Sequence, residues 1–206
     1  MATDDSKPSR VEDPAVGTRT RLVSATAALL QRQGYEATSI KRITAEAGAT
    51  YGSLYHFFPA GKEELAAEAL RHGADDFADL LRRGLDSAPH PADAVAECAH
   101  RLADTLLESD WTDGCPVAAT ALEIIGRSPL IQQASDEALR SWQKLIADKL
   151  VHAGLAVEAA DDLACTVLST LEGAELLARV SGDDAPLRAA ARHLHILVHA
   201  VLQGDT

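Results

Sequence analysis

Apolar residues recur every three or four positions along most of this 206-residue chain, which is the spacing of helices with one buried face. In the first such stretch, Leu22, Thr26, Leu29 and Leu30 follow this spacing until Gly34 ends it. No stretch alternates apolar and polar residues convincingly as a half-buried strand does, so we predict an all-α fold. The periodic stretches predict helices over residues 18–33, 40–47, 51–57, 62–85, 92–109, 116–126, 129–153, 158–180 and 184–202.

Breaks in this pattern divide the chain into an arm and two helical units. Residues 1–16 contain two prolines and no apolar periodicity, so we expect them to form a disordered arm. Residues 17–62 hold the first three helices and are expected to form a small N-terminal unit. Residues 63–206 hold the remaining helices and are expected to form a larger C-terminal helical bundle.

The formal net charge of −12 is distributed unevenly over these parts. Residues 17–62 carry six basic and two acidic side chains, whereas residues 63–206 carry 11 basic and 25 acidic ones. A basic unit joined to an acidic one suggests an anionic partner for the basic unit. Chance clustering of surface charge is the alternative that charge alone leaves open.

Several classes of protein are disfavoured by the composition. The three cysteines are widely spaced and form no CxxC pair, which argues against a disulfide framework and a zinc knuckle and fits a cytoplasmic location. The chain shows no apolar run of the ~18 residues that a membrane span needs, and its N-terminus does not resemble a signal peptide. The sequence also lacks a nucleophile elbow, a phosphate-cradling glycine loop and HExxH, so we expect neither an enzyme nor a cofactor.

The second and third helices have the arrangement of a helix-turn-helix. Gly48 permits a tight turn between them, and the following helix begins with small and hydroxyl residues at Thr50–Ser53 that allow close approach to DNA. A common αα-corner without DNA binding would share this pattern. The residues expected to form its small core are Ile40, Ile43, Ala47, Leu54 and Phe58.

Five segments between residues 19 and 65 agree in order and spacing with one known pattern. They are Ala25–Leu30, Gly34–Ile40, Ile43–Thr50, Gly52–Pro59 and Lys62–Leu65. Together they resemble the N-terminal domain of TetR/AcrR-family transcriptional regulators. The later segment Asp113–Val117 further resembles the LmrA/YxaF-like branch, in which a Gly-Cys-Pro segment opens a central helix.

The resemblance implies which residues meet DNA. It places Arg42 on the phosphate backbone, Tyr51 at the bases and Lys62 at the start of the fourth helix. Two departures matter: Phe57 stands where many members have a phosphate-reaching histidine, and Ala49 replaces the usual valine. The full set of DNA-binding residues implied is Thr38, Ser39, Arg42, Thr50, Tyr51, Gly52, Ser53, Tyr55, His56 and Lys62.

The resemblance also implies that the acidic bundle binds a ligand. Few aromatic residues occur in it, so its pocket should be mainly aliphatic and suited to a hydrophobic small molecule. Glu172 interrupts an apolar run, although a solvated position would explain it equally, and simple core packing would explain the cysteines. The candidate ligand-binding residues are Trp111, Cys115, Glu123, Trp142, Cys165, Glu172 and Glu175.

The last two helices are expected to join two copies of the chain into a homodimer, because apolar residues recur on several of their faces. His195 and His199 are four residues apart, a spacing that can hold a metal ion, but interface packing is the interpretation we adopt, and we expect no metal site. The candidate dimer-interface residues are Leu168, Leu171, Leu176, Leu194, Leu197, Val198 and Leu202.

These observations predict a ligand-responsive regulator of transcription. We expect a repressor that binds double-stranded operator DNA and is released by a hydrophobic small molecule. The helix predicted over residues 62–85 spans the basic and acidic units, so it is expected to transmit the ligand's effect. The alternatives are a DNA-binding regulator without a ligand switch, an activator, or a helical binding protein or enzyme that retains a helix-turn-helix corner.

Overall fold

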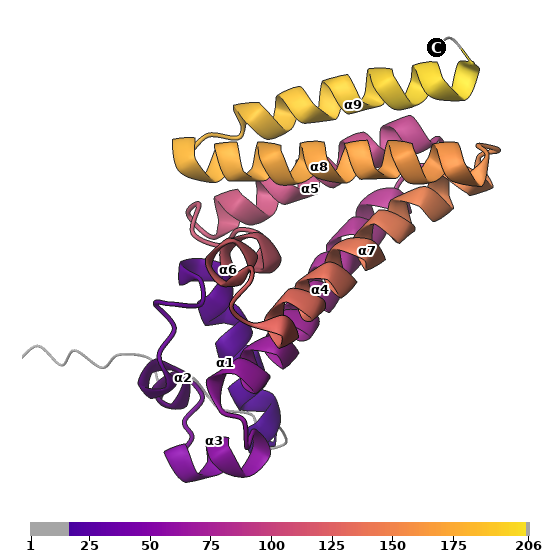
Figure 1. Ribbon diagram of the computed structural model, residues 1–206. Coiled ribbons are helices and arrows are strands. Elements are labelled where there is room, and N and C mark those ends of the chain that lie inside the picture. The colour runs from indigo at the N-terminus through magenta and orange to yellow at the C-terminus, as the bar shows by residue number, and fades with distance from the viewer. Residues whose placement is uncertain (1–16, 205–206) are drawn as a thin grey trace, which may run out of the picture.

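The computed structural model describes residues 17–204, so the arm expected over residues 1–16 lies outside the described residues (Figure 1). Within the described range the chain forms nine helices and no strands, which confirms the all-α prediction. The helices are α1 (Thr18–Gln33), α2 (Ile40–Glu46), α3 (Tyr51–Phe57), α4 (Lys62–Leu85), α5 (Pro91–Glu108), α6 (Pro116–Ile124), α7 (Pro129–His152), α8 (Val157–Ser181) and α9 (Ala185–Gln203).

Side-chain caps explain why several helices begin where the sequence predicts. The side-chain oxygens of Ser39 and Thr50 accept hydrogen bonds from the third residues of α2 and α3. Ser128 caps α7 in the same way and is followed by a proline in the first turn. Each cap satisfies a backbone N–H that the helix itself leaves without a partner. Both ends of each of the nine predicted helices lie within two residues of the observed ends.

The helices form a small unit at one end and a larger bundle at the other. Helices α1, α2 and α3 pack together at the bottom of the view in Figure 1, while α5, α8 and α9 lie across the top. Helices α4 and α7 run side by side between these ends, and α6 sits between α1 and α7. The 24-residue α4 begins in the small unit and ends in the bundle, as the sequence predicts for residues 62–85.

A continuous apolar core extends through both parts. Trp142 is its largest fully buried side chain; its ring lies 4.2 Å from that of Phe77, and its indole N–H donates to the Ala74 carbonyl at 3.0 Å. Cys98 packs against Gly84 where α4 and α5 approach closely, and burial raises the pKa of this thiol to about 12. Cys98 is therefore a core residue, as expected, with little thiolate character.

No helix among residues 17–204 combines the length and the apolar character needed to cross a membrane.

Candidate DNA-binding site and its connection to the bundle

The small unit is built around a compact apolar centre that fixes α2 against α3. Ile43, Leu54 and Phe58 are fully buried, and Ile40 packs against them while partly exposed. Gly48 lies in the turn with a φ of 58°, a left-handed conformation that glycine adopts without a Cβ clash. The core residues predicted for a helix-turn-helix therefore lie where that motif requires them.

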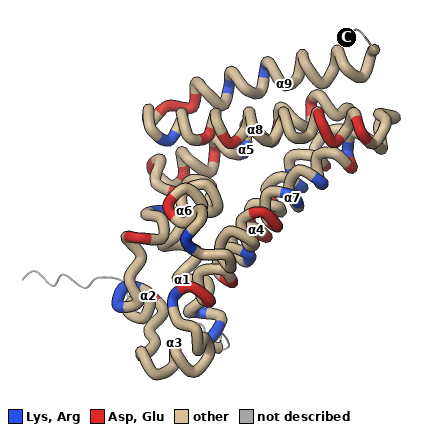
Figure 2. Tube along the Cα trace, viewed as in Figure 1, with Lys and Arg blue, Asp and Glu red and all other residues tan. Residues whose placement is uncertain are grey.

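Helix α3 presents an uncharged, hydrogen-bonding surface to solvent. Tyr51 and Tyr55 are 50% and 49% exposed, which is high for aromatic side chains, and Gly52 between them is also exposed. The Thr50 and Ser53 hydroxyls lie 3.0 Å apart at the start of the helix. Figure 2 shows no Lys, Arg, Asp or Glu on α3, so charge contacts must come from neighbouring elements.

Helix α2 supplies positive charge beside this surface. Lys41 and Arg42 are exposed, and neither forms an ion pair with any residue in the described range (Figure 2). Ser39 is exposed next to them, and its hydroxyl, although it caps the helix, keeps its own O–H free to donate. Lys41 was not among the DNA-binding residues predicted from the sequence, although its positive charge next to Arg42 could have identified it.

Thr38 requires a correction. It was expected to contact a phosphate, but its side chain is fully buried. Its hydroxyl donates to the Gly34 carbonyl at 2.7 Å and accepts from the Gln33 amide at 3.1 Å. The hydroxyl therefore holds the turn between α1 and α2 and is not exposed to a phosphate in this conformation.

Lys62, which was also expected to contact DNA, binds Tyr35 of the same chain. Its ammonium donates to the Tyr35 carbonyl at 2.7 Å and lies 3.7 Å from the centre of the Tyr35 ring. Burial lowers the pKa of Lys62, opposed by the charges of Glu36 and Glu123. Lys62 thus ties the start of α4 to the turn after α1, while the neighbouring candidate His56 remains exposed on α3.

The turn after α1 is bound directly to the bundle. The Glu123 carboxylate on α6 accepts hydrogen bonds from the backbone N–H groups of Tyr35 and Glu36 at 2.6 and 2.9 Å. Gly34 precedes them with a φ of 74°, and a Cβ there would meet the same carboxylate at 2.6 Å. Glycine is needed at this position both for its conformation and for the close approach of Glu123.

Three more contacts reinforce this connection. Arg127 pairs with Glu36 at 2.6 Å, and Arg32 pairs with Asp113 at 3.3 Å. Arg179 on α8 donates to the Arg32 carbonyl at 2.8 Å. Polar contacts of the small unit with α6, with α8 and with the loops beside α6 therefore concentrate on the end of α1 and the turn that follows it.

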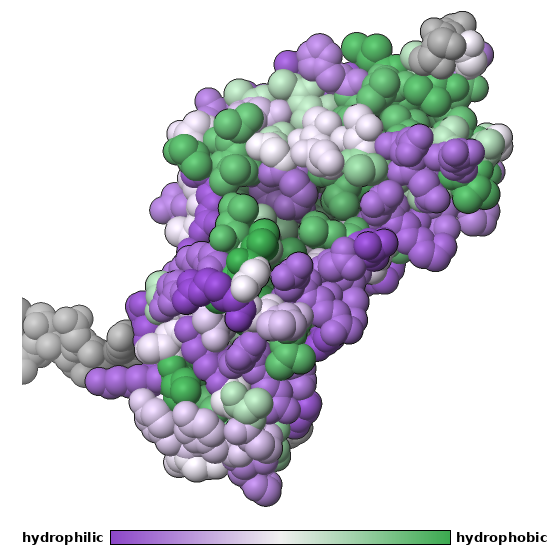
Figure 3. Space-filling view, in the orientation of Figure 1, coloured by the Kyte–Doolittle hydropathy of each residue, from purple (hydrophilic) through white to green (hydrophobic). Residues whose placement is uncertain are grey.

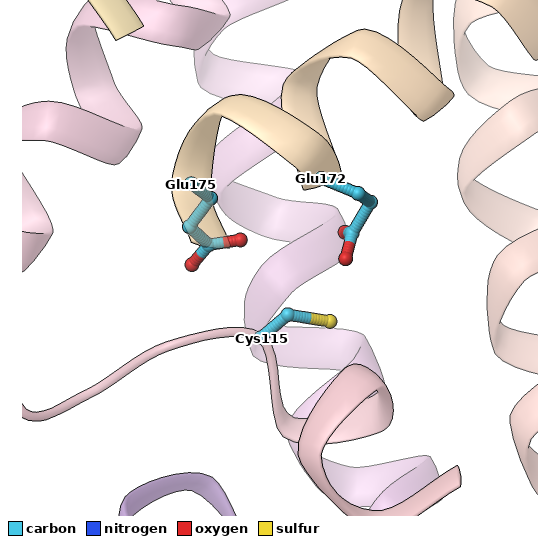
Figure 4. A group of neighbouring side chains, drawn as sticks. All are labelled: Cys115, Glu172 and Glu175. Carbon is cyan, nitrogen blue, oxygen red and sulfur yellow. The ribbon is translucent and has the colours of Figure 1, made fainter. Parts of the chain in front are cut away.

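The candidate ligand-binding residues do not form a single group. Cys115, Glu172 and Glu175 converge where α6 begins and α8 passes it (Figure 4). Burial raises the pKa of all three, and the charge of Glu172 adds to the rise at Glu175. The remaining four lie elsewhere: Trp142 in the core, Glu123 at the α1–α2 turn, Trp111 against the end of α8, and Cys165 exposed on α8 rather than in the core.

Two hollows adjoin the converging residues. A cleft of about 320 Å³ is bounded by α1, α4 and α5, by the segment Asp113–Pro116 and by Glu175. A smaller hollow of about 100 Å³ shares Glu175 and Gly114 with this cleft and is also lined by Cys115, Glu172 and the apolar side chain of Leu122. Glu175 thus borders both spaces.

Comparison with known proteins now decides the family. Residues 22–69 match the model of bacterial regulatory proteins of the tetR family, and residues 91–193 match the C-terminal domain of LmrA/YxaF-like transcriptional regulators. The chain belongs to the TetR family of transcriptional regulators.

Relatives of this TetR-family chain support the assignment over nearly its whole length. The uncharacterised regulator YxaF of Bacillus subtilis is 33% identical and the alignment covers 87% of this chain and 94% of YxaF. The regulator LmrA of the same organism is 30% identical, with 82% and 90% covered. A TetR transcriptional regulator from Chloroflexus aurantiacus J-10-FL is 27% identical, with a TM-score of 0.73 over 88% of this chain and 94% of that chain.

This TetR-family chain is accordingly a DNA-binding regulator of transcription and not an enzyme. The resemblance drawn from residues 19–65 and 113–117 is confirmed by both family matches. The surface formed by α2 and α3 is the helix-turn-helix of the N-terminal domain.

The apolar residues expected at a dimer interface divide into two sets in this TetR-family structure. Leu168, Leu171, Leu194 and Val198 are buried in the chain's own core, so they are not available to a second copy. Leu197 and Leu202 are partly buried against the same core, and Leu176 is exposed. Figure 3 shows apolar surface over α6 and over parts of α8 and α9. The exposed large apolar side chains of α8 and α9 are Val157, Leu176, Leu177, Val180 and Ile196.

Proposed function

We propose that this chain is a homodimeric repressor that a small molecule releases from its operator. The observation that carries the proposal is the set of contacts joining α6 and α8 to the turn after α1. Glu123 holds the backbone of this turn, and Arg179 reaches the last residues of α1. Any ligand that displaces α6 or α8 must therefore move or break contacts of the DNA-binding unit.

On the operator, α3 enters the major groove and α2 holds the backbone beside it. Thr50, Tyr51, Gly52 and Ser53 face base edges, because they form the uncharged cap and first turn of α3, where Ser53 is partly exposed and the other three are exposed. Phosphates are held by exposed side chains that can donate hydrogen bonds or carry positive charge. These side chains are Ser39, Lys41, Arg42, Tyr55 and His56.

The effector occupies the larger cleft, where α1 of the DNA-binding unit faces the bundle. Phe77, Leu80 and Leu102 give this cleft an apolar floor, while His72 and Asp113 offer polar anchors. Gln31, Asp76, Arg83, Thr105 and Glu175 also line the cleft, so the effector that we propose combines an apolar body with several polar groups. Because the cleft is bounded by α1 and α4, a ligand wider than its present width moves these helices apart.

Assembly into a dimer follows from the geometry of DNA. A single recognition helix reads one half-site, and a twofold dimer presents two helices ~34–36 Å apart on one side of the duplex. The exposed side chains Leu177, Val180 and Ile196 lie on α8 and α9, at the end of the molecule away from α3 (Figure 1). We infer that these helices form the contact between the two copies.

Calorimetry with operator DNA tests the switch. A gel shift on the promoter next to the gene first establishes operator binding and its salt dependence. Candidate effectors are then titrated into the protein with and without saturating operator. Coupling energies of ~1–3 kcal/mol predict a 5–150-fold weaker effector affinity in the presence of operator, and linkage requires the same factor in both directions. Equal effector affinities in the two titrations would contradict a ligand-released repressor, and no shift of the promoter fragment would contradict operator binding there.

A further inference from the structure

Three side chains with metal-binding atoms meet at the point where α6 begins beneath α8. The Cys115 sulfur and one carboxylate oxygen from each of Glu172 and Glu175 all lie within 4.8 Å of one another. Figure 4 shows both glutamate side chains on the face of α8 nearest Cys115, with the thiol directed toward Glu172. The cluster thus has the geometry of ligands gathered around one common point.

Two carboxylate oxygens of the cluster lack hydrogen-bond partners among the described residues. Glu175 is 5% exposed, and its Oε2 has no hydrogen-bond partner among the described residues. The same holds for Oε1 of Glu172, three residues earlier on the same helix. Buried polar atoms of native proteins are almost always paired, and buried carboxylates are paired with a charge or bound to a metal ion. Two buried, unpaired carboxylate oxygens beside one thiol therefore require an explanation.

The donor set selects a class of ion. We propose that Cys115, Glu172 and Glu175 bind a divalent cation of the zinc type. Zn²⁺ is bound in proteins by thiolate and carboxylate ligands with tetrahedral geometry. Mg²⁺ and Ca²⁺ require six or more oxygen ligands, and the neighbouring Ala118, Leu122 and Leu176 offer none from their side chains.

The surroundings complete such a site. Three protein ligands would leave one tetrahedral position for water or a donor atom of an effector, and all three residues line the small hollow of about 100 Å³. Arg179 lies beside the cluster, and the absence of a side chain at Gly114 leaves room for its guanidinium. A divalent ion with three anionic ligands has a net charge of −1, which the Arg179 guanidinium neutralises.

Titration of the purified, reduced and metal-free full-length chain with Co²⁺ tests the site. Tetrahedral Co²⁺ bound to a thiolate gives a ligand-to-metal charge-transfer absorption in the near ultraviolet, so the signal reports the sulfur ligand itself. We expect this band to saturate at one equivalent per chain and to disappear when Zn²⁺ is added in competition. Absence of the band at micromolar protein and metal would overturn the proposal.

Matched variants assign the signal to these residues. Cys115→Ser keeps an oxygen that can cap α6 in place of the sulfur, so it removes the ligand while retaining the cap. It should abolish the band and lower Zn²⁺ affinity by about 100-fold or more, since even second-shell changes cost 10–100-fold. Cys165→Ser, which removes the exposed cysteine of α8, should leave both unchanged.

The glutamates provide an independent check if the serine variant folds poorly. Glu175→Gln and Glu172→Gln preserve size and remove charge, so each should weaken Zn²⁺ binding at least 10-fold in calorimetry while the charge-transfer band survives at higher Co²⁺. Binding that is unaffected by all three substitutions but lost in Cys165→Ser or in His195→Ala would place the metal elsewhere and overturn the proposal.

The proposed metal site and the proposed repressor function can be tested independently. Metal binding is measured without DNA, and operator binding is measured in the presence of a chelator, so either can fail alone. The position of the cluster connects the two, because Arg179 beside it donates to the Arg32 carbonyl at the end of α1. Only this connection rests on the proposed function.

Discussion

The backbone N–H of Tyr35 donates a 2.6 Å hydrogen bond to the carboxylate of Glu123, a residue far away in sequence on α6. The same oxygen accepts from the N–H of Glu36, so one side chain satisfies two backbone donors of the turn that leads to α2. Hydrogen bonds to charged groups contribute about 1.5–3 kcal/mol each. The turn that leads to α2 is therefore held partly from within the bundle.

Replacing this carboxylate should impair DNA binding. We expect Glu123→Ala to weaken operator affinity by about 10-fold, equivalent to about 1.4 kcal/mol, because the turn before α2 loses its anchor. Fluorescence anisotropy with labelled operator measures the change. Glu137→Ala is the matched control, since Glu137 pairs with Arg71 away from this turn. Equal operator affinity in the wild type and in Glu123→Ala would show that α2 is positioned without α6.

Arg42 is expected to act through charge alone. Its side chain is exposed on α2 without an ion-pair partner in the described chain. Arg42→Ala should weaken binding to all DNA sequences alike and reduce the slope of log K against log salt by ~0.9 for one phosphate contact. Arg140→Ala on α7 should leave the slope unchanged, because this residue is paired with Asp136 in the bundle. A change confined to one operator sequence would instead assign Arg42 to base recognition.

Tyr51 is expected to act through sequence recognition. It is half exposed at the start of α3, so removing its hydroxyl leaves the core intact. Tyr51→Phe should change the preference at one base pair of each half-site by about 1–3 kcal/mol, measured by binding to a library of operator variants. Tyr55→Phe, on the same helix, should lower affinity for all variants equally. The assignment fails if the two substitutions give the same profile.

Thr38 is expected to matter for folding rather than for phosphate binding. Thr38→Val keeps the shape of the side chain but leaves the Gly34 carbonyl and the Gln33 amide without this buried partner. We expect the free energy of unfolding in urea to fall by about 1–3 kcal/mol. Thr38→Ser retains the hydroxyl and should retain both stability and operator affinity. If Thr38→Val had normal stability but no longer bound operator, Thr38 would be a phosphate-binding residue after all.

The α8 and α9 surface is expected to hold two copies together. Val180 is 80% exposed, so Val180→Glu should not disturb the fold of one chain but should bury a charge between two. Light scattering at micromolar concentration should then change from a dimer to the 21.8 kDa monomer. Leu130→Glu, at an exposed position on α7, serves as the control and should remain dimeric. A wild-type mass of one chain would itself contradict the dimer.

Local patterns were sufficient to predict the helices, because capping residues and apolar spacing act within a few positions along the chain. The core of the helix-turn-helix was also accessible, since Ile43 and Leu54 belong to a short motif with a fixed turn. The burial of Thr38 could not be predicted, because it depends on how the turn folds back over Gln33. A motif describes which residues are present, whereas burial depends on the neighbours that the whole fold provides.

The candidate ligand residues show the same limit at longer range. Cys115, Glu172 and Glu175 were all predicted as ligand-binding residues, and Glu172 stood out because it interrupts an apolar run, but their convergence depends on the crossing of α6 and α8. The spacing of His195 and His199 suggested a possible metal site because both residues lie on one helix. Spacing cannot indicate a site whose ligands come from two helices that are far apart along the chain.

The bonds centred on the turn after α1 also bear on the exchange of DNA-binding units between regulators. A chimaera that joins a foreign unit to this bundle retains Asp113, Glu123 and Arg127, whose partners here are Arg32 and the turn at Tyr35 and Glu36. Suitable foreign units are those with an arginine, a glycine and a glutamate at the positions of Arg32, Gly34 and Glu36. Compatibility thereby depends on the end of α1 and on the packing of α1 against α4 rather than on the exposed face of α3, so that face can be redesigned for a new operator without disturbing the joint.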